Sequence, residues 1–176
     1  MPDIENLTGA DATDFAAVIN GVARPSVRAY NDGAQSIANN TSTPVTFNSH
    51  DGTATAGIHS TSTDTDRFVA TKAGLWMFTY KVHLASDKDG TRISFMRKNG
   101  GTDSNNIIGS AVTVIPSASF GCVLQHTVQV ELALNDYVQC LIYQNSGGAL
   151  NAGYAIATDR GLASSMHATY LGPVAA

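Results

Sequence analysis

The stretch that decides the fold is Leu75-Trp76-Met77-Phe78-Thr79-Tyr80-Lys81-Val82-His83-Leu84, the most apolar segment of the chain. Successive side chains of an extended strand point to opposite sides, so residues two apart share a face. Here one face collects the large residues Trp76, Phe78, Tyr80, Val82 and Leu84. This period of two predicts a β-strand whose aromatic face forms part of a hydrophobic core.

The opposite face of this strand begins with two more apolar residues, Leu75 and Met77. A sandwich strand whose outer side meets water carries polar residues there. We therefore expect the outer face to be covered by a second partner. In a monomer that partner is a loop or the N-terminal segment, and in an oligomer it is another copy of the chain.

Segments with the same alternation fill the chain on both sides of this strand. The clearest runs from Cys122 to Leu132, with Cys122, Leu124, His126, Val128, Val130 and Leu132 on one face. Further strands are expected over residues 27–30, 44–47, 67–70, 92–97, 111–115, 137–143, 152–157 and 166–171. Turns rich in Gly, Asn and Asp separate them, and residues 51–66 have the composition of a surface loop. This organisation predicts an all-β, antiparallel jelly-roll sandwich over residues 26–176.

Residues 1–25 follow a different pattern, with apolar side chains at helical spacing around Phe15, Val18 and Ile19. The pattern ends at Arg24-Pro25, because proline disfavours a helical residue before it. So small an apolar face is not stable alone. We therefore predict that residues 1–25 form a short helix or arm that anchors the domain by docking on something else.

The composition excludes several classes of function. Charged residues make up 14% of the 176-residue chain, and the formal net charge is −4. Without a basic surface, nucleic-acid binding is disfavoured. No apolar run approaches the ~20 residues needed to cross a bilayer, so we expect no membrane insertion. The acidic start, Met1-Pro2-Asp3-Ile4-Glu5, lacks the positive charge of a signal peptide, so synthesis in the cytoplasm is expected.

The two cysteines, Cys122 and Cys140, do not have the spacing of metal ligands. If the strands on either side of Leu134-Asn135 pair as a hairpin, the two residues are offset by about 17 Å along the strands. A disulfide requires Cα atoms within ~7 Å. We therefore expect both thiols to be free.

The histidines give no sign of catalysis or of a metal site. None of the five has the spacing of a metal-binding pair, and His126, on an apolar face, is expected to be a hydrogen-bonded core residue. His50-Asp51 could belong to a triad, but the chain has no Gly-x-Ser-x-Gly nucleophile motif. We expect no enzymatic activity and no cofactor.

Two short acidic segments, residues 64–66 and 87–90, contain the carboxylates that a calcium site needs. Asp87-Lys88-Asp89-Gly90 resembles the start of an EF-hand loop, but Arg92 and Lys98 occupy the positions that need Gly and Glu, so an ordinary turn is expected. Calcium ligation by Asp64 and Asp66 is an expectation that comes only from the family resemblance given below. The alternative for that pair is an exposed polar loop.

The order of these segments resembles the tumour necrosis factor-like jelly roll, in particular the globular head of complement C-one-q and its phage and bacterial relatives. The closest match is Arg67-Phe68-Val69-Ala70-Thr71-Lys72-Ala73-Gly74-Leu75-Trp76-Met77-Phe78-Thr79-Tyr80. Weaker matches follow in the expected order at Met96–Gly100, Leu132–Val138 and Tyr170–Gly172. The opening segments, residues 27–47, look most like domains of tailed-phage structural proteins.

The resemblance implies a homotrimer whose three-fold axis is lined by the strand after Gly74. Mapping by motif places Met77, Thr79 and Tyr170 at the contact between subunits. It also implies a non-enzymatic virion protein, either a head decoration or head fibre or a tail-borne receptor-binding protein. The arm would bind other virion proteins, and a host-surface glycan or protein is a further candidate partner. The alternative is a bacterial carbohydrate- or protein-binding module that uses the loops at residues 51–66 and 104–106.

Overall fold

The computed structural model describes residues 24–101, 106–113, 121–153 and 163–174. These residues form an all-β structure with no α-helix among them, and every strand pair is antiparallel. The predicted fold class is confirmed. Residues 1–23 lie outside the described part, so the predicted arm and the division of the chain at residue 25 stay predictions.

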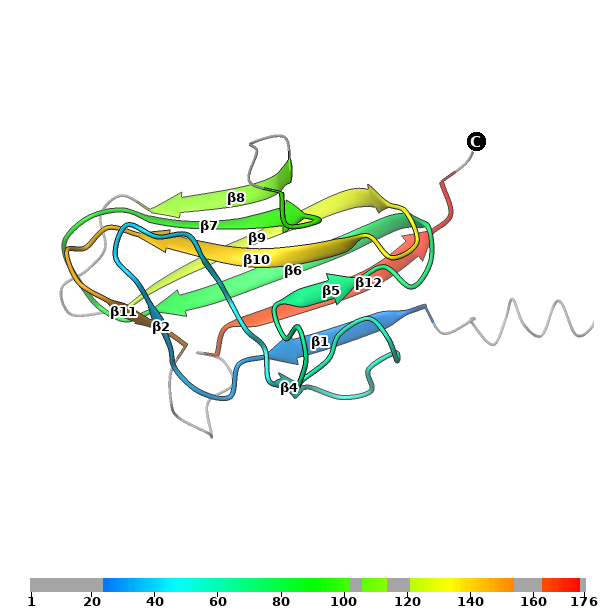
Figure 1. Cartoon of the computed structure of the whole chain (residues 1–176), viewed down its shortest axis with the longest axis horizontal. Coiled ribbons are helices and arrows are strands. Elements are labelled where there is room, and N and C mark those ends of the chain that lie inside the picture. Colours follow the sequence, from blue (N-terminus) through cyan, green and yellow to red (C-terminus); the bar gives the residue numbers. More distant parts are fainter. Residues whose placement is uncertain (1–23, 102–105, 114–120, 154–162, 175–176) are drawn as a thin grey trace, which may run out of the picture.

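The strands form two sheets that lie face to face, with the long strands running along the same direction of the molecule (Figure 1). The first sheet contains β1 (Ser26–Tyr30), β2 (Gln35–Ile37), β4 (Ser49–His50), β6 (Gly74–Leu84), β9 (Cys122–Leu132), β11 (Leu150–Ala152) and β12 (Ser165–Gly172). The second contains β3 (Thr43–Pro44), β5 (Arg67–Val69), β7 (Arg92–Lys98), β8 (Ile107–Thr113) and β10 (Tyr137–Gln144).

Strand β6 lies at the centre of the first sheet. One of its edges pairs with β9 from Gly74↔Leu132 to Leu84↔Cys122. The other edge pairs with β12 and then, at Leu84, with β11. A strand held on both edges has its backbone hydrogen bonds satisfied, which fixes the direction of each of its side chains.

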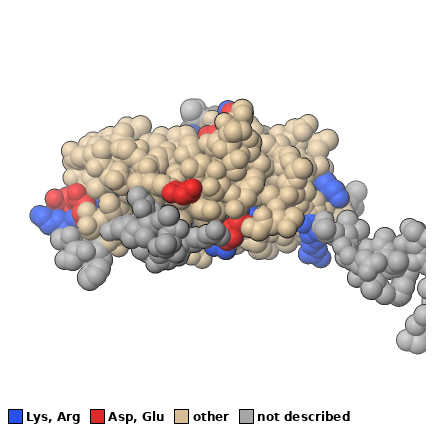
Figure 2. Space-filling view, turned by 90° about the horizontal axis from the view of Figure 1, so that it is seen from below, with Lys and Arg blue, Asp and Glu red and all other residues tan. Residues whose placement is uncertain are grey.

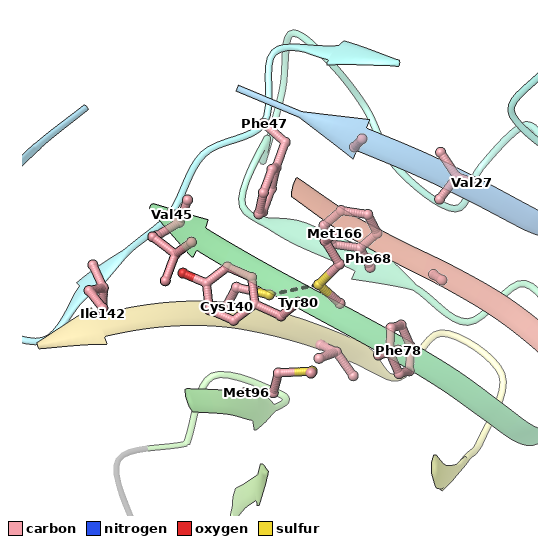
Figure 3. Close-up of a cluster of buried hydrophobic side chains, with 14 of the residues drawn as sticks. Val27, Val45, Phe47, Phe68, Phe78, Tyr80, Met96, Cys140, Ile142 and Met166 are labelled. Atoms are coloured by element: carbon pink, nitrogen blue, oxygen red, sulfur yellow. Dashed lines mark hydrogen bonds between the residues drawn. The ribbon is translucent and has the colours of Figure 1, made fainter. Parts of the chain in front are cut away.

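The hydrophobic core fills the space between the sheets (Figure 3). Trp76, Phe78 and Tyr80 are at most 1% exposed, so the prediction for the aromatic face of β6 is confirmed. Phe47 and Phe68 extend this cluster from the other elements, with their ring centroids 5.4 Å apart in an edge-to-face arrangement. Aromatic pairs prefer this geometry, which adds to the free energy gained by burial.

Two turn residues explain how β6 and β10 begin. Gly74 has a φ of 140°, and a Cβ atom there would overlap the carbonyl oxygen of Gly172 and the ring of Tyr170. Only glycine fits this entry into β6. Asn135 precedes β10 with a φ of 69°. Asparagine tolerates this left-handed conformation better than most residues.

Some strand boundaries differ from the prediction. The strand expected over residues 44–47 is shorter and lies at Thr43–Pro44; beyond it the amide of Val45 donates to the carbonyl of Cys140 in β10, and that of Phe47 donates to the carbonyl of Thr65 just before β5. The strand expected at 111–115 begins earlier, at Ile107.

The two cysteines are unbonded, but the hairpin assumed for them is wrong. β9 pairs with β6 in the first sheet, whereas β10 pairs with β7, β5 and β3 in the second. The turn at Leu134-Asn135 therefore carries the chain from one sheet to the other. Cys140 is fully buried, with its Sγ 2.6 Å from the Sδ of Met166, and burial raises the pKa of its thiol well above the ordinary value.

Charged side chains are sparse on the visible surface. Figure 2, which views the molecule from the side of β1 and β4, shows uncharged residues over most of the described surface. Lysine, arginine, aspartate and glutamate form small groups, several of them at the two ends of the molecule.

The core position of Phe78 makes a first prediction. Replacing it with alanine removes a side chain that is 1% exposed and leaves a cavity, so the free energy of unfolding should fall by about 3–5 kcal/mol. Urea denaturation at a fixed protein concentration measures this change. Asn151→Ala, at an exposed position of β11, is the control and should change stability by less than ~0.5 kcal/mol. A loss below ~1 kcal/mol for Phe78→Ala would contradict the assigned core.

Candidate assembly face

The outer side of the first sheet presents residues from three neighbouring strands in register. We call this surface the assembly face. It is built from cross-strand rows: Gln129, Met77 and Thr169 form one, and Thr127, Thr79 and His167 form the next. Each row crosses β9, β6 and β12 in that order, because strand pairing sets residues of equal parity side by side.

Hydrogen bonds within the rows fix several polar side chains. The hydroxyls of Thr79 and Thr127 lie 3.0 Å apart, so one donates to the other across the β6–β9 pair. The hydroxyl of Thr169 lies 3.2 Å from Nε2 of His167 along β12. These groups satisfy part of their hydrogen-bonding capacity inside the face, which lowers the cost of removing them from water.

The two rows carry no permanent charge. Burial and the nearby Arg28 lower the pKa of His167, which favours the neutral ring. The flanking charges are Lys81 and Glu131, toward opposite ends of β6, and Arg28, which lies beside His167 on β1 and is paired with Asp51. Met77 is half-buried and neighbours polar, uncharged side chains. A face of this composition can be covered by protein without stripping water from an ion, which is the property of the centre of a protein interface.

The structure brings together two of the three residues predicted at the subunit contact. Met77 and Thr79 lie two residues apart on the assembly face. Tyr170 does not: its ring packs against Trp76 at a centroid distance of 5.4 Å, and its hydroxyl donates to the carbonyl of Ala73. Tyr170 has the parity of the buried Met166 and Ala168 and therefore points toward the core.

On β12 the residues that lie beside Met77 and Thr79 are Thr169 and His167, which the sequence analysis did not single out. The alternation of β12 was the signal that could have found them, since they alternate with buried residues. The predicted anchoring residues Phe15, Val18 and Ile19 lie outside the described residues.

His126 points toward the core as expected, but only one of its two ring nitrogens has a hydrogen-bond partner among the described residues. Its Nδ1 lies 3.3 Å from the hydroxyl of Ser94, and its ring packs edge-on against Tyr80. Its Nε2 is buried without a hydrogen-bond partner in the described part of the chain. Burial lowers the pKa of His126, so the neutral ring is favoured.

The segment compared with an EF-hand loop is an ordinary turn that wraps around an arginine. Arg92 is fully buried, and its guanidinium donates to the carbonyl oxygens of Asp89 at 2.7 Å and Asp87 at 3.3 Å. The carbonyls that a cation would need are thus already bound by the protein's own positive charge.

The second acidic segment is engaged in other contacts. Asp64 forms an ion pair with Arg67 at 3.4 Å, and Asp66 accepts a hydrogen bond from the side chain of Gln139. Within the described ranges, no group of three or more His, Cys, Asp or Glu side chains could hold a metal ion. No helix in the described part of the chain has the length and apolar character needed to cross a bilayer.

His50 and Asp51 do not form the acid–base pair considered from the sequence. Nε2 of His50 lies 2.8 Å from Nδ1 of His59, and Asp51 pairs with Arg28 at 2.8 Å. The contact between the two histidines joins residues nine apart through a loop, so no spacing rule predicts it. Nε2 of His59 donates to the carbonyl of Thr65 at 3.0 Å, so its Nδ1 accepts from Nε2 of His50, and these two bonds orient both rings.

Comparison with known proteins supports the fold and goes no further. No protein-family model matches the sequence, and no curated protein matches it at a significant level. Solved structures do match. Eiger, a tumour necrosis factor from S. frugiperda, has a TM-score of 0.60 and 10% identity over 87% of this chain and 96% of that one.

Two further structures match over a similar extent. The globular domain of a zebrafish complement 1qA protein has a TM-score of 0.58 and 14% identity, covering 85% of this chain and 99% of that one. Murine APRIL has a TM-score of 0.57 and 11% identity, covering 84% and 99%. These likenesses establish a tumour necrosis factor-like jelly roll as the fold of this chain.

The lowered pKa values of four histidines make the free energy of unfolding depend on pH. The pKa values of His59, His83, His126 and His167 are all lowered in the folded protein, with burial as the largest cause. The unfolded chain therefore binds protons more readily. The stability linked to these residues is complete above pH ~6.5 and is lost as pH falls toward their folded pKa values.

Thermal unfolding should consequently shift to lower temperature between pH 7.5 and pH 5, measured by circular dichroism at one protein concentration. His126→Gln removes one of these titrating groups and should make the pH dependence shallower. A midpoint that is constant or rises as the pH is lowered over this range would show that the assignment is wrong.

Proposed function

We propose that the chain is a non-enzymatic module that assembles as a homotrimer through the assembly face. The observation that carries this proposal is the uncharged pair of rows on the outside of the first sheet, centred on Met77 and Thr79. The tumour necrosis factor-like fold supports it, because the sequence resemblance places the equivalent strand at a three-fold axis.

A competing surface exists on the outer side of the second sheet. Ile93, Phe95 and Tyr143 there line a shallow hollow together with Ile107, and Val112 is 56% exposed. Both surfaces extend over three paired strands, and the assembly face is favoured because its central strand, β6, is the one that the sequence resemblance places at the three-fold axis.

The finer part of the proposal is a place on the virion of a tailed phage, either as a head decoration or head fibre or as a tail-borne receptor binder. It rests on the resemblance of residues 27–47 to phage structural domains. The arm of residues 1–25 attaches the trimer to other virion proteins, and the jelly roll points outward. A bacterial carbohydrate- or protein-binding module is the alternative, and genes for head or tail proteins beside this one would favour the virion.

Replacing Met77 with arginine tests the assembly face. At a three-fold axis the substitution brings three like charges together away from water, so the trimer should dissociate. Light scattering at micromolar concentration should give a mass near three times the 18.4 kDa of one chain for the wild-type protein, and a mass near one chain for Met77→Arg.

Val112→Arg is the matched control, because it places the same charge on the outer face of the second sheet. It should leave the mass unchanged. A monomeric wild-type protein would refute the trimer. A trimer that is disrupted by Val112→Arg and not by Met77→Arg would move the interface to the second sheet.

The arm is tested by a chain that begins at Arg24. This chain keeps the carbonyl of Pro25, which accepts a hydrogen bond from the amide of Tyr170. We expect its thermal stability and trimeric mass to be retained and its incorporation into virions to be lost. Asp substitutions at Phe15 and Ile19 in the full chain should have the same effect, since burying a charge against a docking surface is costly. Normal incorporation of either variant would rule out the arm as the anchor.

A further inference from the structure

A cavity of about 650 Å³ opens between the loop at residues 57–64, strand β5 and the start of β10. Its volume lies in the range of small-molecule binding sites. None of the residues of the two central rows of the assembly face lines it, so trimer formation through that face and occupation of the cavity do not exclude each other. The loop that forms one wall is held in shape, because the hydroxyl of Ser60 accepts hydrogen bonds from the amides of Ser62 and Thr63.

One part of the cavity lining is apolar. Its exposed part consists of the half-buried Val69 and the half-buried ring of Tyr137, next to Ile58, which is fully buried. The guanidinium of Arg67 lies over this ring, 4.9 Å from its centroid, which restrains both side chains. One face of the Tyr137 ring is thus occupied by Arg67, and the rest of the ring and Val69 form the apolar part of the lining.

The rest of the lining carries planar polar groups of complementary kinds. Asp64 supplies a carboxylate that accepts, Arg67 a guanidinium that donates, and Asn135 an amide that does both. Asp64 and Asn135 both have a left-handed backbone, with φ values of 48° and 69°. Two tight turns therefore present these two residues to the same cavity.

The charges of the cavity cancel. Asp64 and Arg67 form an ion pair at 3.4 Å, and burial lowers the pKa of His59, which favours the neutral ring. No unpaired cation among the lining residues remains to neutralise a phosphate or a carboxylate. An anionic ligand would meet the carboxylate of Asp64 as well as the guanidinium, so the site selects for an uncharged ligand.

We propose that this cavity binds a neutral saccharide. A sugar ring has an apolar face of C–H groups and an edge of adjacent hydroxyls, each of which donates and accepts. Val69 and the part of the Tyr137 ring that Arg67 leaves open fit the ring face, and Asp64, Arg67 and Asn135 fit the hydroxyls. The inference concerns a different surface from the trimer contact and holds for a virion protein and for a bacterial module alike.

The test uses the full-length protein on a printed array of neutral and sialylated oligosaccharides, followed by calorimetric titration with the free sugar that binds. Asp64→Asn and Asn135→Gly each remove or alter one polar group and keep the left-handed backbone accessible. Each should weaken binding by about tenfold or more. Asp89→Asn is the matched control, because its side chain is 64% exposed against 58% for Asp64 and lies outside the cavity.

Binding of a neutral glycan that is weakened by both cavity variants and not by Asp89→Asn would support the site. The proposal is overturned by a wild-type protein that binds no neutral glycan, by one that binds only sialylated glycans, or by binding that both cavity variants retain. Light scattering and thermal unfolding of the same variants should match the wild-type protein, so that loss of sugar binding is distinguished from loss of the trimer or of the fold.

Discussion

The double pairing of β6 is the constraint on which the rest of the structure depends. Each of the eleven residues of this strand faces a residue of β9, and most of them also face β12. A strand fixed on both edges must direct its alternate side chains to opposite sides. The inner set seals the core through Trp76, Phe78 and Tyr80, and the outer set forms the middle of the assembly face. Core packing and the proposed assembly therefore rest on the same backbone register.

The two proposed surfaces are built in different ways, which explains why they differ in chemistry. The assembly face consists of uncharged side chains on regular strands, and its hydrogen bonds run between its own threonines and histidine. The saccharide cavity lies where loops meet the edge of the sandwich, and left-handed turns present its polar groups. A flat, uncharged sheet suits contact with a second copy, whereas a concave and polar loop region suits a small ligand.

Alternation predicted much of the fold from the sequence. The period of two placed Trp76, Phe78 and Tyr80 in the core, and the apolar residue at Met77 indicated a face in need of a partner. The same alternation indicates that Tyr170 points inward, because Tyr170 is in step with the buried Met166 and Ala168. The motif match instead placed Tyr170 at the contact between subunits. Alternation describes one strand at a time and does not say which strand lies beside it. For that reason β9 and β10 were wrongly expected to form a hairpin.

Contacts through loops were beyond the reach of sequence patterns. The pairing of His50 with His59, the burial of Arg92 under its own turn and the meeting of Asp64 with Asn135 in one cavity all depend on how separate segments pack. The spacing of residues within one segment does not indicate how separate segments pack together. The candidate cavity could accordingly be found only from the structure, although residues 51–66 had been expected to form a surface loop.

The solvent accessibility of Met77 in the assembled protein tests most directly whether the assembly face is buried between copies of the chain. Among the described methionines, Met96 and Met166 are fully buried within one chain, and Met77 is half-buried on the assembly face. Peroxide oxidation followed by peptide mass spectrometry reports how accessible each thioether is. If the assembly face is buried between copies, Met77 in the wild-type protein at micromolar concentration should resist oxidation as strongly as Met96 and Met166, and Thr79→Arg should make it reactive. Rapid oxidation of Met77 in the wild-type protein would show that this face is open to water and would contradict the account.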